Sequence, residues 1–131
     1  MKNKRKQSQT KFNQKQAFLF MDITKEQFES FLQSHTFPLE PNQNKLSFPK
    51  LLRIFKRMVN NKPFTAIKVG EEKIIDGHHR YVCAEFLSKD LETTEGGVNI
   101  SHEVDLSWKE ILIEDEDWDH EEDLKAYTDE F

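Results

Sequence analysis

The sequence predicts one small α/β domain of the α+β type, with a mixed sheet packed against about three helices. The chain has 131 residues, which suits a single core of roughly 100 to 150 residues. Apolar residues make up 36% of the chain and aromatic residues 11%, so a core can form although 33% of the residues are charged. Segments with helical periodicity alternate with short segments that are typical of strands.

The two ends of the chain differ from its middle in composition and charge. Residues 1–16 are rich in Lys, Gln and Asn and carry a net charge of +6, whereas residues 92–131 carry −13. Because residues 1–16 cannot bury enough apolar surface to offset the entropy lost on ordering, we predict a flexible basic arm there. We expect the folded domain to span residues 17–118 and an acidic tail to span residues 119–131.

These charges allow two interpretations. Both ends can be solvated segments that keep the protein in solution. Alternatively, the basic arm contacts nucleic acid phosphates or folds back on the acidic third of the chain. The charge pattern alone identifies no partner.

The composition also restricts the compartment and the kinds of site. Cys83 is the only cysteine, so neither an internal disulfide nor a cysteine-based zinc site can form. His35, His102 and His120 show no ligand spacing, and we predict no metal-ligating residues. The N-terminus lacks the apolar run of a signal peptide, and no stretch approaches the ~20 apolar residues that span a bilayer. We therefore expect a cytoplasmic protein with no membrane partner.

The first part of the domain is predicted to contain a strand, a helix and a loop. The apolar run of residues 17–21 is typical of a buried strand. Thr24 is suited to the N-cap of a helix, because Gln27 stands three residues later and completes a capping box. Pro38 and Pro41 then favour a loop, since proline removes a backbone donor and restricts the residue before it.

A second helix is expected from about Ser47 to Asn60, with Ser47 as its cap. Apolar residues recur at three- and four-residue spacing along one face. The other face is mostly basic: Lys50, Arg53, Lys56 and Arg57. We expect this basic face to be solvated, with nucleic acid binding as the alternative.

A hairpin and a third helix are expected next. Residues 64–69 and 73–75 are predicted to be strands joined by a tight turn at residues 70–72. A helix is predicted from His79 to about Leu87, because apolar residues recur there with helical periodicity.

The last part of the chain is predicted to be a strand followed by an acidic segment. Residues 100–108 alternate between apolar and polar types, which is typical of a half-buried strand. Residues 111–113 can extend the sheet, and residues 114–123 are expected to form a solvated helix or tail. We expect Trp108 and Trp118 to cover the edge of the sheet.

The most informative motif is Asp76-Gly77-His78-His79-Arg80, at the junction of the predicted strand and helix. A helix N-terminus presents unpaired N–H groups and the positive end of the helix dipole, which favours a bound phosphate. Gly77 allows close approach of the backbone, Arg80 can bind phosphate oxygens, and His78 or His79 can donate further hydrogen bonds. The alternative is a structural turn in which Asp76 caps the helix, His79 is exposed and Arg80 pairs with a surface carboxylate.

The run from Ile74 to Tyr81, followed by Ala84, resembles the signature of the ParB/sulfiredoxin superfamily. It is most similar to the Asp-Gly-His-His-Arg form of the ADP- or ATP-dependent free-serine kinases and of uncharacterised ParB-like domains. The likeness covers residues 39–87, with a specific five-residue core and flanks that match in pattern only. It implies a ParB/sulfiredoxin-like fold in which Gly77 to Arg80 hold the phosphates of a nucleotide.

Two departures from the family restrict the activity. Sulfiredoxins have a catalytic cysteine where this chain has His78, so sulfiredoxin chemistry is not expected. Chromosome-partitioning ParB proteins continue into a helix-turn-helix DNA reader, whereas the segment after Leu87 is acidic and would repel phosphates. Operator-specific DNA binding is not expected either.

Three hypotheses about function remain. The first is a binding module that senses or uses a nucleotide through the Asp76–Arg80 turn. The second is a nucleotide-dependent small-molecule kinase, for which the resemblance implies Glu40 as the general base; Asp76 could orient magnesium or the substrate. The third is a DNA-associated accessory or nuclease-like protein that uses the basic arm.

The expected cofactor is ATP or ADP, with CTP as an alternative, together with magnesium. Whether the protein is an enzyme, a phosphotransferase or a nucleotide hydrolase, is left open.

Overall fold

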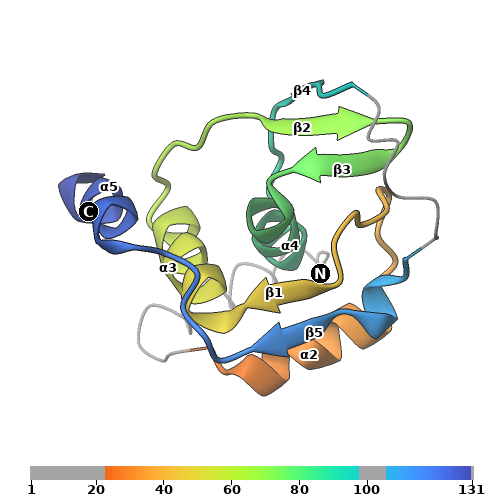
Figure 1. Ribbon diagram of the computed structural model, residues 1–131, viewed down its shortest axis with the longest axis horizontal. Helices are drawn as coiled ribbons and strands as arrows, with labels where there is room; N and C mark the ends of the chain where they lie inside the picture. The colour runs from red at the N-terminus through yellow and green to blue at the C-terminus, as the bar shows by residue number, and fades with distance from the viewer. Residues whose placement is uncertain (1–22, 98–105, 131) are drawn as a thin grey trace, which may run out of the picture.

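Residues 23–97 and 106–130 are described by a computed structural model and form a mixed α/β fold, as the sequence predicts (Figure 1). Their helices are α2 (Lys25–Ser34), α3 (Phe48–Val59), α4 (His78–Leu87) and α5 (Glu121–Glu130), with a short 3-10 helix, η1 (Trp108–Glu110). The predicted arm of residues 1–16, the predicted strand of residues 17–21 and most of the predicted strand of residues 100–108 lie outside the described residues. Within the described part of the chain, no helix combines the length and the apolar composition that a bilayer-spanning segment requires.

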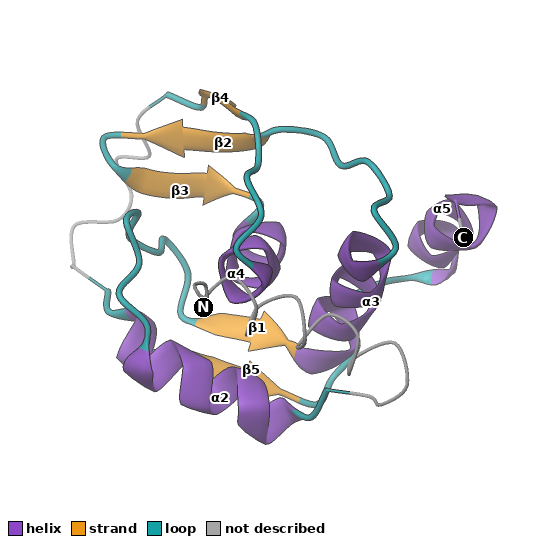
Figure 2. Ribbon diagram, turned by 180° about the vertical axis from the view of Figure 1, so that it is seen from behind, coloured by secondary structure: helices purple, strands orange, loops and turns teal. Residues whose placement is uncertain are grey.

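The strands form two small sheets. In one sheet β1 (Lys45–Ser47) pairs in parallel with β5 (Leu112–Glu114). In the other, β2 (Ile67–Gly70) lies between the antiparallel β3 (Lys73–Asp76) and the parallel β4 (Thr93–Glu95). Helix α4 lies between the two sheets in Figure 1, and α5 projects from one side. The reverse view in Figure 2 shows α2 in front of β5.

The predicted caps of the first two described helices are confirmed. The Thr24 Oγ1 accepts the Gln27 N–H at 3.2 Å, and the Gln27 Oε1 accepts the Thr24 N–H at 2.7 Å, which completes the capping box. In α3 the Ser47 Oγ accepts the Lys50 N–H at 3.4 Å. Both helices therefore begin where the sequence predicts, because each cap satisfies a backbone donor that the helix itself cannot.

Aromatic rings from three helices form the centre of the core. Phe28 of α2, Phe55 of α3 and Phe86 of α4 pack mutually, with ring centroids 5.5–5.9 Å apart in edge-on or tilted arrangements. Such geometry is the favoured one for aromatic pairs and adds about 0.5–1.5 kcal/mol per pair to the burial of their area. Cys83 of α4 is fully buried beside this core and its Sγ lies 3.3 Å from the Leu51 carbonyl oxygen.

The hairpin forms as predicted, but its first strand begins later than expected, at Ile67 rather than residue 64. The carbonyls just before β2 accept hydrogen bonds from arginine side chains instead of from a neighbouring strand. The Arg57 Nη2 donates to the Pro63 oxygen at 3.0 Å, and the Arg80 Nη1 donates to the Thr65 oxygen at 2.9 Å. The segment is thereby held as a loop beside α3 and α4.

The hairpin turn contains an avoidable strain, which gives a first prediction. Glu71 and Glu72 both have positive φ, 53° and 65°, as a type I′ turn requires, and this turn favours Asn-Gly because a Cβ is disfavoured there. The double variant Glu71→Asn, Glu72→Gly should therefore raise the free energy of unfolding by about 1 kcal/mol, measured by urea denaturation. The control Glu71→Gln, Glu72→Gln removes the same charges and should gain much less. Equal gains in both variants would show that charge, not backbone strain, limits the turn.

The region around η1 differs from the prediction. Trp108 is not in a strand at the sheet edge: it begins η1, its Nε1 donates to the Leu39 oxygen at 2.8 Å, and its ring stacks on Phe37 with centroids 4.6 Å apart. Residues 112–114 do form a strand, β5, but it pairs with β1 in the two-stranded sheet and does not join the sheet of the hairpin. Sheet partners depend on contacts distant in the sequence, which a local pattern does not contain.

The segment after β5, residues 115–120, is only partly the solvated acidic segment that we predict from its charge: Asp115, Glu116, Asp117 and His120 are exposed, whereas Asp119 is buried. It folds back over α3, where Arg53 pairs with both oxygens of Asp117 and donates to the Asp119 Oδ2 at 2.6 Å. The Lys50 Nζ lies 3.4 Å from the Asp119 Oδ1, and the Asp119 side chain is only 2% exposed. The expectation of a solvated basic face on α3 is therefore wrong for Lys50 and Arg53.

Candidate phosphate-binding site

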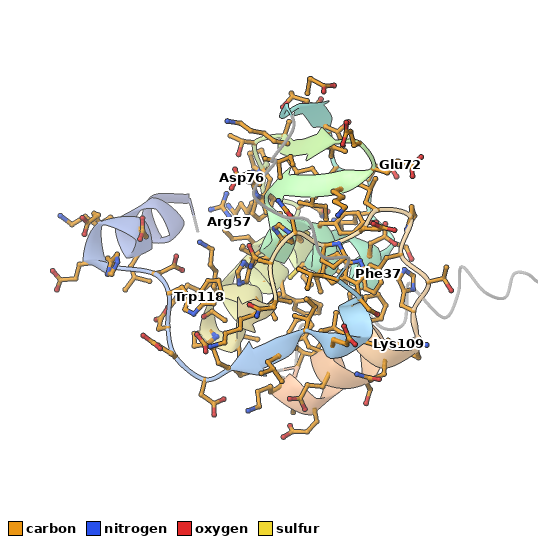
Figure 3. The ribbon with its side chains drawn as sticks, turned by 45° about the vertical axis from the view of Figure 1, so that its right-hand side comes forward. Phe37, Arg57, Glu72, Asp76, Lys109 and Trp118 are labelled. Atoms are coloured by element: carbon orange, nitrogen blue, oxygen red, sulfur yellow. The ribbon has the colours of Figure 1, made fainter. Side chains whose placement is uncertain are left out.

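A cavity of about 480 Å³ opens at the N-terminus of α4, and all five residues of the Asp76–Arg80 motif line it. Helix α3 contributes Lys50, Ile54 and Arg57 to its wall, and the loop before β2 contributes Pro63, Phe64 and Thr65. Gln43 and Trp118 complete the lining. Figure 3 shows the labelled Asp76, Arg57 and Trp118 on one side of the molecule.

Gly77 controls how α4 begins. It is the N-cap, with φ 106° and ψ 29°, and no side chain caps the helix, so Asp76 does not have the capping role of the structural alternative. The first intrahelical bond runs from the Tyr81 N–H to the Gly77 oxygen at 2.9 Å. Among the described residues, the backbone N–H groups of His78, His79 and Arg80 have no acceptor. They are the donors that a helix leaves for an anion.

Arg80 is held at the wall of the cavity by the loop before β2. Its Nη1 donates to the Thr65 oxygen at 2.9 Å and to the Thr65 Oγ1 at 2.6 Å, and its Nη2 lies 3.4 Å from the Asp76 Oδ2. The side chain is 16% exposed. A guanidinium has five N–H donors, so these contacts orient the charge and leave further donors for a ligand.

His78 and His79 are buried, with exposures of 4% and 6%, so the alternative of an exposed His79 is wrong. The His78 Nε2 accepts the Asn42 N–H at 2.8 Å, and the His79 Nε2 accepts the Ser47 N–H at 2.9 Å. Because an amide N–H donates to each Nε2, the proton of each neutral ring is on Nδ1. Neither Nδ1 has an acceptor among the described residues, and both residues line the cavity. Each ring therefore has one donor to offer.

Burial keeps these two rings neutral. It lowers the pKa of His78 to about 4, partly offset by Asp76, and the pKa of His79 to about 3, with Lys50 and Arg80 lowering it further. As donors to a phosphate, the rings act through a neutral N–H and not as cations.

Positive charge predominates around the cavity. The described lining contains three cations, Lys50, Arg57 and Arg80, and one carboxylate, Asp76; Lys50 is also paired with Asp119, which is not in the lining. The Arg57 guanidinium lies over the Phe64 ring, 5.0 Å from its centroid. The sequence predicts Lys50 and Arg57 on a solvated face. Their i, i+7 spacing, with Ile54 between them at i+4, is nevertheless consistent with one stripe of the helix, which is where the structure has them.

Glu40 is not among the residues that line this cavity. Its backbone pairs with the start of the hairpin's second strand: the Glu40 N–H donates to the Glu72 oxygen and the Ile74 N–H donates to the Glu40 oxygen, both at 2.9 Å. Asp76 stands at the other end of that strand. The structure thus brings Asp76 and Gly77–Arg80 together and does not bring Glu40 into the same lining.

Asp76 is compatible with a magnesium ion that arrives with a nucleotide. Mg²⁺ is usually held by one or two carboxylates plus substrate phosphates and water. The Asp76 side chain is 65% exposed at the cavity and its nearest cation, Arg80, is 3.4 Å away, so it can supply one oxygen ligand. Within the described part of the chain, no cluster of three or more His, Cys, Asp or Glu side chains suits a metal ion bound by protein alone.

Trp118 also lines the cavity, which differs from its expected place at a sheet edge. Its indole meets the His79 ring edge-on, with centroids 5.2 Å apart.

The comparisons with protein-family models, with curated proteins and with solved structures each gave no match, so the likeness to the ParB/sulfiredoxin superfamily stays a prediction.

Proposed function

We propose that this protein binds the phosphate groups of a nucleotide in the cavity at the Asp76–Arg80 turn. The observation that carries the proposal is the first turn of α4, where three backbone N–H groups without acceptors stand beside Arg80 in the lining of one cavity. Phosphate oxygens match such donors in both charge and geometry.

The electrostatics of the lining support the same ligand class. Arg57 adds a positive charge from α3, and Lys50 adds another that is shared with Asp119, whereas Asp76 adds one negative charge. A magnesium ion held by Asp76 and the phosphates would neutralise part of the negative charge of the phosphates. The neutral Nδ1–H groups of His78 and His79 would add hydrogen bonds without adding charge.

The proposal is limited to binding. Phosphoryl transfer to a small molecule needs a base within hydrogen-bond reach of the accepting hydroxyl, or one water away. Glu40, the residue that the family resemblance implies for this role, does not line the cavity. No other observation favours the kinase hypothesis or the DNA-associated hypothesis over a binding module.

The test is a thermal-shift and calorimetry panel of ATP, ADP, CTP and GTP with Mg²⁺. A ligand that binds only the native state at a hundredfold excess over its dissociation constant adds ~2.7 kcal/mol, which should raise the Tm by several degrees. Arg80→Gln keeps a polar side chain but removes the charge, and should weaken binding by roughly 10- to 100-fold.

The matched control is Lys109→Ala, which removes an exposed positive charge that does not line the cavity, well away from Asp76 in Figure 3. It should leave affinity unchanged. If no nucleotide shifts the Tm at millimolar concentration, or if the Arg80 and Lys109 variants bind alike, the proposal is wrong.

A further inference from the structure

We infer that the cavity contains a second subsite, in which the base of the nucleotide stacks on Trp118. The ligand class is then a nucleoside phosphate, and not inorganic phosphate or a phosphate ester without an aromatic group. This inference rests on the proposed function, because it assigns the part of the same cavity that lies beside the phosphate-binding turn.

The size of the cavity favours a ligand larger than phosphate. Its volume of about 480 Å³ lies in the range of roughly 300 to 1,000 Å³ that is typical of small-molecule sites. A water molecule occupies about 30 Å³, and a phosphate group is only a few times larger than a water molecule. A lone phosphate would therefore leave most of the cavity to solvent. The remaining wall is partly apolar, with Ile54, Phe64 and Trp118 among its residues.

Contacts within the protein hold Trp118 in the wall of the cavity. Its backbone N–H donates to the Ser47 Oγ at 3.3 Å, its indole Nε1 donates to Glu114, and its ring contacts His79 edge-on. The side chain is half-buried, unlike the buried Trp108. A preorganised aromatic surface binds a base with little further loss of side-chain entropy.

The contact with His79 places the two subsites next to each other. His79 belongs to the first turn of α4, whose N–H groups are proposed to hold phosphate, and its ring centroid is 5.2 Å from that of Trp118. A base on Trp118 and phosphates at the turn are therefore within the reach of one nucleotide.

Phe64 is the other aromatic residue in the lining, but it is less suited to the role. The Arg57 guanidinium lies over its ring at 5.0 Å from the centroid, so one face of Phe64 is already engaged in a cation–π contact. Trp118 has one described ring contact, the T-shaped one with His79, and its indole is a larger π surface than the Phe64 ring. We therefore assign stacking to Trp118.

The experiment compares nucleoside triphosphates with inorganic tripolyphosphate, each with Mg²⁺, by calorimetry on the full chain. Nucleotides should bind about 5- to 100-fold more tightly than tripolyphosphate, which corresponds to one base–aromatic stack. Trp118→Leu, which keeps apolar volume but has no π face, should remove this advantage by lowering the nucleotide affinity much more than the tripolyphosphate affinity. Trp118→Phe should retain most of it.

Fluorescence gives a readout that does not depend on the Trp118 variants folding. In a Trp108→Phe background Trp118 is the only tryptophan of the chain, and nucleotides should change its emission much more than tripolyphosphate does. If tripolyphosphate binds as tightly as nucleotides and Trp118→Leu changes neither, the base subsite is wrong while the phosphate site stands. If neither ligand binds, the proposed function itself fails, and the inference fails with it.

Discussion

Replacing Gly77 by alanine is expected to lower the free energy of unfolding by roughly 2–5 kcal/mol and to abolish the proposed binding of a nucleotide. Two effects add here. The φ of 106° is in the left-handed range, which costs an L-residue about 1–2 kcal/mol. A Cβ would also lie 2.5 Å from the Ile67 Cγ2 and 2.9 Å from the Arg80 Nη2. Because Ile67 is buried at 1% exposure, relieving the first contact means moving β2, an overpacking cost of about 1–3 kcal/mol.

The chain provides a matched control at Gly97. Its φ of 79° is also positive, but a Cβ there would meet no atom of the described residues within 4 Å. Gly97→Ala should therefore show the backbone cost alone, about 1–2 kcal/mol by urea denaturation, and leave binding intact. Equal losses of stability in the two variants would show that the contact with Ile67 does not constrain the start of α4.

The local structure around this turn could be predicted from the sequence because its determinants are local. Thr24 and Gln27 lie within one helical turn of each other, as do Ser47 and Lys50, so each cap is visible in a short window. Helix α4 could be placed for a similar reason, from the glycine that separates a strand pattern from a helical one. In each of these cases a few neighbouring residues satisfy the backbone donors that decide where the helix begins.

The composition of the site could not be predicted, since it depends on contacts between distant segments. Trp118 and Asp119 come from a segment about 65 residues beyond α3, and their charge and composition are typical of a solvated tail. The salt bridges with Lys50 and Arg53 bring that segment onto α3, and the indole into the cavity with it. The opposite charges of α3 and of the segment around Asp119 indicate that a contact between them is favourable. They do not indicate which of the many possible ion pairs forms.

The hydrogen-bond partners of His78 and His79 could not be predicted from the sequence either. Both were expected as donors at an anion site, whereas each uses its Nε2 to accept a backbone N–H from a residue more than thirty positions earlier. His78 thus fixes the loop at Asn42, and His79 fixes the start of α3 at Ser47. The two rings serve the fold through Nε2, and only their Nδ1–H groups remain for a ligand.

Because these rings are buried as neutral groups, stability should fall steeply between neutral and mildly acidic pH. The pKa of His78 is lowered from 6.5 to about 4 and that of His79 from 6.5 to about 3. Between those values and 6.5 the unfolded chain binds protons that the native chain does not, so the free energy of unfolding decreases as the pH falls. From pH 7.5 to pH 5 each histidine should account for a loss of up to about 2 kcal/mol.

The measurement is urea denaturation at both pH values for the native sequence and for the double variant His78→Gln, His79→Gln. Glutamine can present an oxygen near the position of each Nε2, so it can still accept the Asn42 and Ser47 N–H groups, but it does not titrate. The variant should lose some stability at pH 7.5 and much less than the native sequence on acidification. His120→Gln, at an exposed position, should retain the full pH dependence. If the double variant also retains it, carboxylates and not the buried histidines are responsible for the loss, and the neutral, amide-accepting state of His78 and His79 is wrong.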